Sequence, residues 1–244
     1  MKHCVPAGLG DAFASELGTL GIVTTPRQQE WMLQYLLALL DENTRINLTR
    51  ITDPENAVRL HLVDSLAALP ELSTAPAGRV LDIGSGGGFP GVPLAAVSSR
   101  EFVLLDSVAK KVNAVASVLD SLPPSEATIT VSPERAEQIA GSDTMRFAAV
   151  VARAVAPLPS LVELASPVLM DGGLLIALKG SPQEAEYVSG RTAAQLVGMQ
   201  ESTRRELMLP GGGEARTIVV YRKTGRPRVA LPRRTGLAQN SPLA

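Results

Sequence analysis

Two aspartates mark the ends of short apolar runs, and a glycine-rich stretch follows the first of them. Asp82 lies in the run 79–83, which breaks at once into residues 84–91, Gly-Ser-Gly-Gly-Gly-Phe-Pro-Gly. Asp106 ends a second apolar run, about 22 residues after Gly84. Such a pattern predicts a buried strand, a tight turn and a helix start, because glycine permits positive φ angles and close ligand approach. If the runs are neighbouring parallel strands, both carboxylates lie at the sheet edge where open α/β sheets bind ligands.

The chemistry of this edge suits a nucleoside ligand. Backbone N–H groups of a glycine turn and a helix N-terminus attract polar or anionic groups, and a carboxylate after the second strand suits ribose hydroxyls. Dinucleotide enzymes and S-adenosylmethionine enzymes both use this plan, and residues 86–91 match G-x-G-x-x-G literally. Asp82 favours the methyl donor, because a carboxylate would repel a pyrophosphate but suits an ammonium or a sulfonium. A glycine turn without a ligand is the third interpretation.

The composition is that of an ordinary globular protein. The chain has 244 residues, 45% of them hydrophobic and 19% charged, with a formal net charge of −1. This length suits one large α/β domain with additions. No apolar run approaches the roughly 18 residues of a membrane span, so we expect no membrane partner. A single cysteine and no signal-peptide pattern indicate a cytoplasmic protein. Two histidines and one cysteine are too few for a recognisable cluster of metal ligands, so we expect no metal site.

The chain divides into three parts by pattern. Residues 1–70 predict a helical extension, with helices over 9–20, 26–43 (begun by a Thr25–Gln28 capping box) and from 53 towards 70. Residues 71–223 predict an α/β core, and residues 224–244 a basic, flexible tail. In the core, expected strands at 79–83, 101–105, 127–131, 147–152 and 174–178 alternate with helices near 108–121 (N-capped by Ser107), from 157, and at 182–197. Asp171-Gly172-Gly173 is expected to be a turn before the fifth strand, and a hairpin over 204–209 and 216–221 closes the sheet. The whole predicts a doubly wound, mostly parallel, seven-stranded sheet.

Polar residues stand at or just after the carboxyl ends of five of these strands. They are Asp82, Asp106, Glu137, Arg153 and Lys179, and we expect them to line one crevice. Any one of them alone could form a common surface salt bridge, but five polar residues at five such ends would be an unusual coincidence.

The tail is the second notable region. After Glu214 there is no acidic residue, whereas seven Arg and Lys residues follow it, with prolines interspersed. A solvated tail and an arm that contacts phosphates both fit this pattern. His61, on an expected helix, is either a ligand or acid–base group or simply a hydrogen-bonded side chain.

Taken together, the motifs closely resemble the small-subunit (16S) ribosomal RNA guanine-N7 methyltransferases, the glucose-inhibited division protein B family. The resemblance is carried by residues 47–49, 61–66, 82–91, 105–107 with Lys110 and Lys111, 135–137, 152–158 and 177–180. In the tail, 233–236 and 242–243 fit the family pattern, while Ala238 and Asn240 replace its proline and lysine.

The resemblance implies a class I, Rossmann-like methyltransferase that uses S-adenosylmethionine. The implied reaction is methylation of guanine N7 in the 530 loop of 16S ribosomal RNA, by a monomer acting on RNA or on the small ribosomal subunit. The candidate cofactor-binding residues are Asp82, Gly84, Gly86, Phe89, Asp106 (ribose), Ala136, Glu137 (adenine amino group) and Arg153. The candidate RNA-binding residues are Asn47, His61, Lys179, Arg228, Arg233 and Arg234.

Guanine N7 already carries a lone pair, so the expected transfer is direct and in line, and needs no general base. No catalytic residue is therefore assigned; Arg153 and Lys179 are candidates for positioning a phosphate, the donor's carboxylate or guanine O6. Cys4 is the only cysteine, which excludes covalent attack on a pyrimidine, and the absence of an Asn-Pro-Pro-Tyr-like segment after the fourth strand disfavours amino methylation. A small-molecule methyltransferase, a nicotinamide oxidoreductase and a non-catalytic RNA-binding module are the alternatives. With 3% aromatic residues, base-stacking platforms are scarce, which weakens the last of these.

Overall fold

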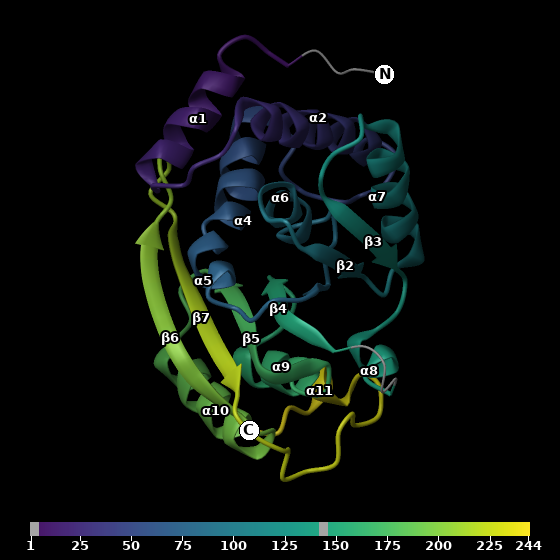
Figure 1. The fold of residues 1–244 in the computed structure, drawn as a ribbon, viewed down its shortest axis with the longest axis vertical. Coiled ribbons are helices and arrows are strands. Elements are labelled where there is room, and N and C mark those ends of the chain that lie inside the picture. The colour runs from purple at the N-terminus through teal and green to yellow at the C-terminus, as the bar shows by residue number, and fades with distance from the viewer. Residues whose placement is uncertain (1–4, 142–145) are drawn as a thin grey trace.

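The computed structural model describes residues 5–141 and 146–244, and a seven-stranded sheet runs through its centre (Figure 1). The strand order is β3-β2-β1-β4-β5-β7-β6, with parallel pairing from β3 to β5 and antiparallel pairing of β7 with both β5 and β6. The strands are β1 (Val80–Ile83), β2 (Glu101–Leu105), β3 (Thr128–Ser132), β4 (Phe147–Arg153), β5 (Leu169–Lys179), β6 (Met199–Met208) and β7 (Ala215–Lys223). The predicted doubly wound, mostly parallel sheet with its antiparallel hairpin is confirmed.

Helices cover both faces of the sheet, and each face has its own apolar core. On one face lie α1 (Leu9–Thr19), α2 (Pro26–Asn43), α6 (Gly91–Val97) and α7 (Ala109–Ser121), with the segment α3 (Pro54–Ala57), η1 (Val58–Val63), α4 (Asp64–Leu66) and α5 (Leu69–Ser73). On the other lie α8 (Ala136–Ile139), α9 (Leu158–Ala165), α10 (Glu184–Leu196) and α11 (Leu237–Asn240). No helix of the described residues is long and apolar enough to cross a membrane.

The helices that precede β1 pack directly on the sheet domain. The capping box that begins α2 is present, with Gln28 N–H donating to Thr25 Oγ1 (3.2 Å) and Thr25 N–H to Gln28 Oε1 (2.8 Å). Asp53 caps the next helical segment through Asn56 N–H (2.8 Å). That segment continues through the π-helical turn η1, which carries His61 towards the end of β4.

Two local predictions are wrong. Asp171-Gly172-Gly173 lies inside β5 rather than before it, because the pairing with β4 shifts register between Phe147 and Ala149 and Gly172 (φ +77°) absorbs the irregularity. Val108, not Ser107, precedes the first turn of α7, and no side chain caps it.

The C-terminal segment packs against the domain instead of extending as a flexible arm. In Figure 1 this yellow segment runs beside α8, α9 and α10. Arg233 donates two hydrogen bonds of 2.6 Å to the buried carboxylate of Glu163, and Ala238 is 2% exposed. Val229, Leu231 and Leu243 pack on the core cluster of this face. Charge and proline content suggested an extended chain, but the apolar residues between the arginines give the segment a surface to bury.

Candidate active site

The glycine-rich loop between β1 and α6 is shaped by close packing. Gly84, Gly86 and Gly88 have φ angles of +71°, +55° and +84°, a region that favours glycine. A Cβ on Gly84 would stand 2.5 Å from Val155 Cγ2. The loop is tied down by the Tyr35 hydroxyl, which donates to the Gly87 carbonyl over 2.8 Å. Glycine therefore lets the turn adopt this backbone without strain, and at Gly84 it also avoids a clash with Val155.

Asp82 lies beneath this loop and not in the cavity wall. Its side chain is fully buried, and Oδ2 accepts a 2.8 Å hydrogen bond from Gly91 N–H at the start of α6. Burial raises the pKa of this carboxyl to about 7. The reason is strand alternation: Leu81 and Ile83 pack on the α9 face, so Asp82 points to the α6 face together with Val80. The predicted contact between Asp82 and the methyl donor is corrected: Asp82 is absent from the cavity wall, and its carboxyl group holds the start of α6 instead.

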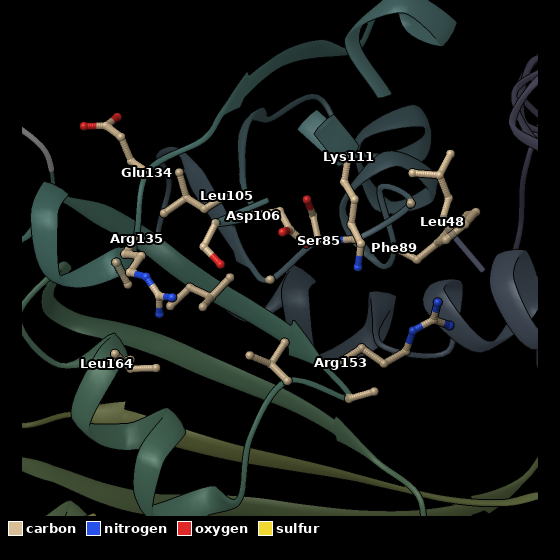
Figure 2. A pocket seen from close by; sticks show the side chains of 18 of the residues that line it. Leu48, Ser85, Phe89, Leu105, Asp106, Lys111, Glu134, Arg135, Arg153 and Leu164 are labelled. Atoms are coloured by element: carbon tan, nitrogen blue, oxygen red, sulfur yellow. Dashed lines mark hydrogen bonds between the residues drawn. The ribbon is translucent and has the colours of Figure 1, made fainter. Parts of the chain in front are cut away.

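A cavity of about 380 Å³ opens at the carboxyl ends of β1, β2 and β4. Its wall includes Gly84, Gly86, Phe89, Asp106, Ala136, Glu137 and Arg153. Asp106 accepts hydrogen bonds from Gly86 N–H (3.0 Å) and Val108 N–H (2.9 Å), so it also joins the two loops. In Figure 2 it lies next to Ser85, while Lys111, Arg135 and Arg153 approach from the rim and Glu134 extends away. Seven of the eight predicted cofactor residues thus line one cavity.

The C-terminal segment also contributes to this cavity, which the sequence did not indicate. Glu137 Oε1 accepts a 2.9 Å hydrogen bond from Gly236 N–H, and Gln239 lines the cavity. The only sequence signal was the loose family pattern of the tail. Within that pattern, Gly236 is the residue whose N–H binds Glu137.

Arg153 stands at the centre of a buried cluster on the far side of the cavity. Its Nη1 donates to the Leu60 carbonyl (2.9 Å) and to Asp64 Oδ2 (3.1 Å), and its Nη2 lies 3.3 Å from His61 Nδ1. Asp64, whose side chain is 5% exposed, also accepts from Arg216 Nε over 2.9 Å. Sequence reasoning missed the roles of Asp64 and Arg216, because their partners lie 89 and 152 positions away along the chain.

His61 is a neutral part of this cluster. Burial, and next the Arg153 cation, lower its pKa to about 3, with the nearby Leu60 carbonyl acting in the opposite direction. Its ring stacks on Phe89, with centroids 4.5 Å apart, and its Nε2 lies 2.8 Å from Thr49 Oγ1. A neutral, stacked imidazole cannot act as a cationic RNA contact at neutral pH. The simpler of the two sequence interpretations, a hydrogen-bonded side chain, describes its contacts.

A second cavity of about 530 Å³ adjoins the first. The two share Leu48, Thr49, His61, Arg153 and Ala154 as wall residues. Arg50, Lys179 and Arg216 give the second cavity its basic lining. Lys179 is already engaged, since its Nζ lies 2.8 Å from Glu186 Oε1 and donates to the Ala156 carbonyl over 3.1 Å.

The remaining predicted RNA contacts lie outside both cavities. Asn47, Arg228 and Arg234 are exposed. Arg233 is paired with Glu163 over 2.6 Å, so its guanidinium is held by the protein, and its predicted contact with RNA stays a prediction. In the described part of the chain, no cluster of three His, Cys, Asp or Glu side chains is arranged to hold a metal ion.

Comparison with known proteins assigns the family. Residues 28–211 match the model of GidB, rRNA small subunit methyltransferase G. The chain belongs to this family. Two relatives, both named ribosomal RNA small subunit methyltransferase G, agree along nearly the whole length. The Deinococcus radiodurans protein is 39% identical (92% of this chain, 88% of the relative), and the Desulfitobacterium hafniense protein is 35% identical (92% and 93%).

Among solved structures, the CcbJ methyltransferase from Streptomyces caelestis superposes with a TM-score of 0.51 at 14% identity, covering 67% of this chain and 90% of that one. This likeness concerns the fold alone. Membership of the GidB family makes the chain an S-adenosylmethionine-dependent rRNA methyltransferase.

Proposed function

We propose that this protein transfers a methyl group from S-adenosylmethionine to N7 of a guanine in 16S ribosomal RNA, acting as a cytoplasmic monomer on the small ribosomal subunit. One observation carries the proposal beyond family membership. A nucleoside-sized cavity with a carboxylate at the end of β2 shares a wall with a second, basic cavity. Two reactants held in adjoining cavities can meet at that wall.

The first cavity fits the cofactor. Its volume of about 380 Å³ lies within the range of small-molecule sites. Asp106 would accept from the ribose hydroxyls, since a carboxylate offers more lone pairs than its two backbone donors use. Glu137 keeps Oε2 for the adenine amino group while Oε1 holds Gly236. When bound, S-adenosylmethionine supplies an electrophilic methyl group.

The chain's own contribution is orientation. Guanine N7 offers a lone pair, so no proton has to be removed. His61, the one histidine in the cavity wall, is held between Thr49, Arg153 and Phe89. Arg153 is committed to Asp64 and Leu60, so we assign it to fixing the shared wall. Placing two reactants in line can by itself supply roughly 7–11 kcal/mol of the rate enhancement.

Three cations are available for RNA phosphates near the cavities. Arg50, Lys111 and Arg135 line the cavities and have no ion-pair partner within 4 Å among the described residues. Each phosphate that they neutralise would steepen the salt dependence of binding. Asn47, Arg228 and Arg234, which are exposed, extend this proposed RNA surface beyond the cavities.

Methyl-labelled S-adenosylmethionine, supplied with small ribosomal subunits or with deproteinised 16S RNA, tests the proposal. We expect one labelled 7-methylguanosine, located by mass spectrometry of nuclease fragments. Asp106→Asn should weaken cofactor binding about 10-fold or more, because an amide oxygen cannot replace a carboxylate that serves two loops and a ligand. Glu134→Gln, at the cavity rim, is the matched control. Label found only in small metabolites, or thermal stabilisation by NAD instead of the methyl donor, would contradict the assignment.

A further inference from the structure

Thr49 occupies the wall that the two cavities share. It is half-buried and lies in the loop between α2 and α3. Asn43 holds this loop, with its Oδ1 accepting from Leu48 N–H (2.7 Å) and Thr49 N–H (2.9 Å). The backbone of Thr49 is therefore fixed, and its hydroxyl is the polar group that the loop presents at the wall.

The contacts of His61 determine which of its ring nitrogens carries a proton. The Arg153 guanidinium can only donate hydrogen bonds, and its Nη2 lies 3.3 Å from His61 Nδ1. Nδ1 must therefore be unprotonated and accept. A neutral imidazole then carries its proton on Nε2, which lies 2.8 Å from Thr49 Oγ1. His61 is the donor in that contact, and Thr49 is the acceptor.

This assignment leaves the Thr49 hydroxyl with one unused function. A hydroxyl has two lone pairs and one proton. One lone pair accepts from His61 Nε2–H and the other from Ile51 N–H over 3.0 Å. With His61 as the donor, these are the two hydrogen bonds of the Thr49 hydroxyl among the described residues, and neither uses its proton. The hydroxyl proton is therefore free to be donated to a ligand at the shared wall.

We propose that Thr49 donates a hydrogen bond to O6 of the target guanine and so selects guanine over adenine. This inference rests on the proposed function. Guanine presents two acceptors on the edge concerned, N7 and O6, whereas adenine presents N7 and an amino donor. Since N7 must face the methyl group, O6 is the acceptor left for the protein. With adenine, the amino group and the Thr49 hydroxyl would meet donor to donor.

A neutral donor also suits the reaction. Methylation at N7 places positive charge on the base, and a guanidinium against O6 would oppose that charge. Arg153 spends its donors on Leu60, Asp64 and His61. The cluster thus keeps the Arg153 guanidinium for contacts within the protein, and the donor offered to the base is the neutral Thr49 hydroxyl.

A combined change of protein and substrate tests the proposal. The two substrates are small subunits reconstituted with site-specifically ligated RNA, which carries either guanine or 2-aminopurine at the methylated position. 2-Aminopurine keeps N7 but lacks O6. The protein variants are Thr49→Val, which removes the hydroxyl, and Thr49→Ser, which keeps it. For the wild type we expect kcat/KM to fall about 10-fold on 2-aminopurine, the value of one hydrogen bond.

The expected signature is non-additivity. Thr49→Val should lose about 10-fold on guanine and nothing further on 2-aminopurine, while Thr49→Ser behaves as the wild type. Equal losses of Thr49→Val on both bases would overturn the proposal and leave the hydroxyl a role in folding only. A weakened cofactor Kd with unchanged base preference would overturn it in favour of the donor's carboxylate. A wild type that methylates neither RNA would contradict the proposed function itself.

The protonation of His61 gives an independent check that needs no Thr49 variant. The chain has two histidines, so ¹⁵N spectra of histidine-labelled protein are assignable with one His3→Gln variant. At pH 7 we expect an unprotonated Nδ1 and a protonated Nε2 for His61. The opposite tautomer would overturn the proposal, because the Thr49 hydroxyl would then donate its hydrogen bond to His61 Nε2.

Discussion

The two adjoining cavities are built in different ways. The wall of the first comes mainly from short stretches at the ends of successive strands, and much of it is backbone at positions such as Gly84 and Gly86. The second is bounded by charged side chains from distant parts of the chain, with Asp64, Arg153 and Arg216 in contact across up to 152 positions. The first is a local motif repeated along a sheet edge, whereas the second exists only after the N-terminal helices dock.

This difference predicts how each cavity fails. A change in the first should alter ligand affinity through the shape of a turn. A change in the second should first destabilise the protein, because removing one member of a buried charge cluster leaves its partners uncompensated. Four substitutions, in order of decreasing expected effect, test this contrast.

The largest effect is expected from Asp64→Asn. This carboxylate pairs with Arg153 (3.1 Å) and Arg216 (2.9 Å), and the change leaves two partly buried guanidinium groups without their hydrogen-bonded carboxylate. We expect a loss of about 2–4 kcal/mol in the free energy of unfolding, measured by urea denaturation. Glu42→Gln, in a 3.5 Å pair with the exposed Arg45, is the control and should cost at most about 0.5 kcal/mol. Similar values for the two variants would mean that the buried cluster of the second cavity contributes no more to stability than a surface pair does.

Gly84→Ala should disturb the first cavity through both backbone and packing. The new Cβ meets Val155 at 2.5 Å, in a backbone conformation that costs any side chain about 1 kcal/mol or more. We expect about 2–3 kcal/mol of destabilisation and at least roughly 10-fold weaker cofactor binding by calorimetry. Gly86→Ala has a positive φ but no atom within 4 Å of its Cβ, and should cost only the backbone part. If Gly86→Ala were the more harmful change, packing against Val155 would not be what fixes the loop.

Asp82→Asn should alter the pH dependence of stability. The carboxyl's folded-state pKa of about 7 lies above its ordinary value of 3.8, so the folded state holds a proton that the unfolded state releases between about pH 4 and 7. The stabilising contribution of the protonated carboxyl is fully present below pH 4 and is lost as the pH rises to 7. As the pH rises from 4 to 7, the free energy of unfolding of the variant should therefore increase by about 1–3 kcal/mol relative to that of the wild type.

His61, whose pKa is lowered to about 3, acts with the opposite sign in the same range. Because His61 is present in both proteins, its effect cancels in the difference between them. A difference that stays constant from pH 4 to 7, measured by thermal and urea unfolding, would mean that Asp82 is ionised throughout.

The smallest effect is expected from Asn47→Ala. This exposed side chain lies in neither cavity wall, so stability should change by less than about 0.5 kcal/mol and cofactor affinity should not change. Filter binding to 16S RNA then isolates its proposed contact. An RNA affinity equal to that of the wild type would remove Asn47 from the RNA surface.

Sequence reasoning succeeded where a residue's role follows from its neighbours in the chain. Strand alternation, the glycine turn and the aspartate after β2 placed Asp106, Gly84 and Gly86 in one wall. It failed for Asp82: the residue lies in β1 as predicted, but its side chain binds Gly91 and does not line the cavity. Successive side chains of a strand point to opposite faces of the sheet, so a shift of one residue reverses the face. The spacing between motifs does not indicate which face a given residue takes.

What the sequence by itself determined is the fold class, the family and the cofactor edge of the sheet, because each depends on patterns that repeat over a few residues. Only the tertiary structure decided that the basic tail packs on Glu163 and Glu137, and that Arg153 is held by Asp64 rather than free for RNA. The physical reason is that a charge in the sequence has no partner until folding supplies one. Its burial and its counter-ion, both properties of distant segments, then fix whether it binds a ligand or the protein itself.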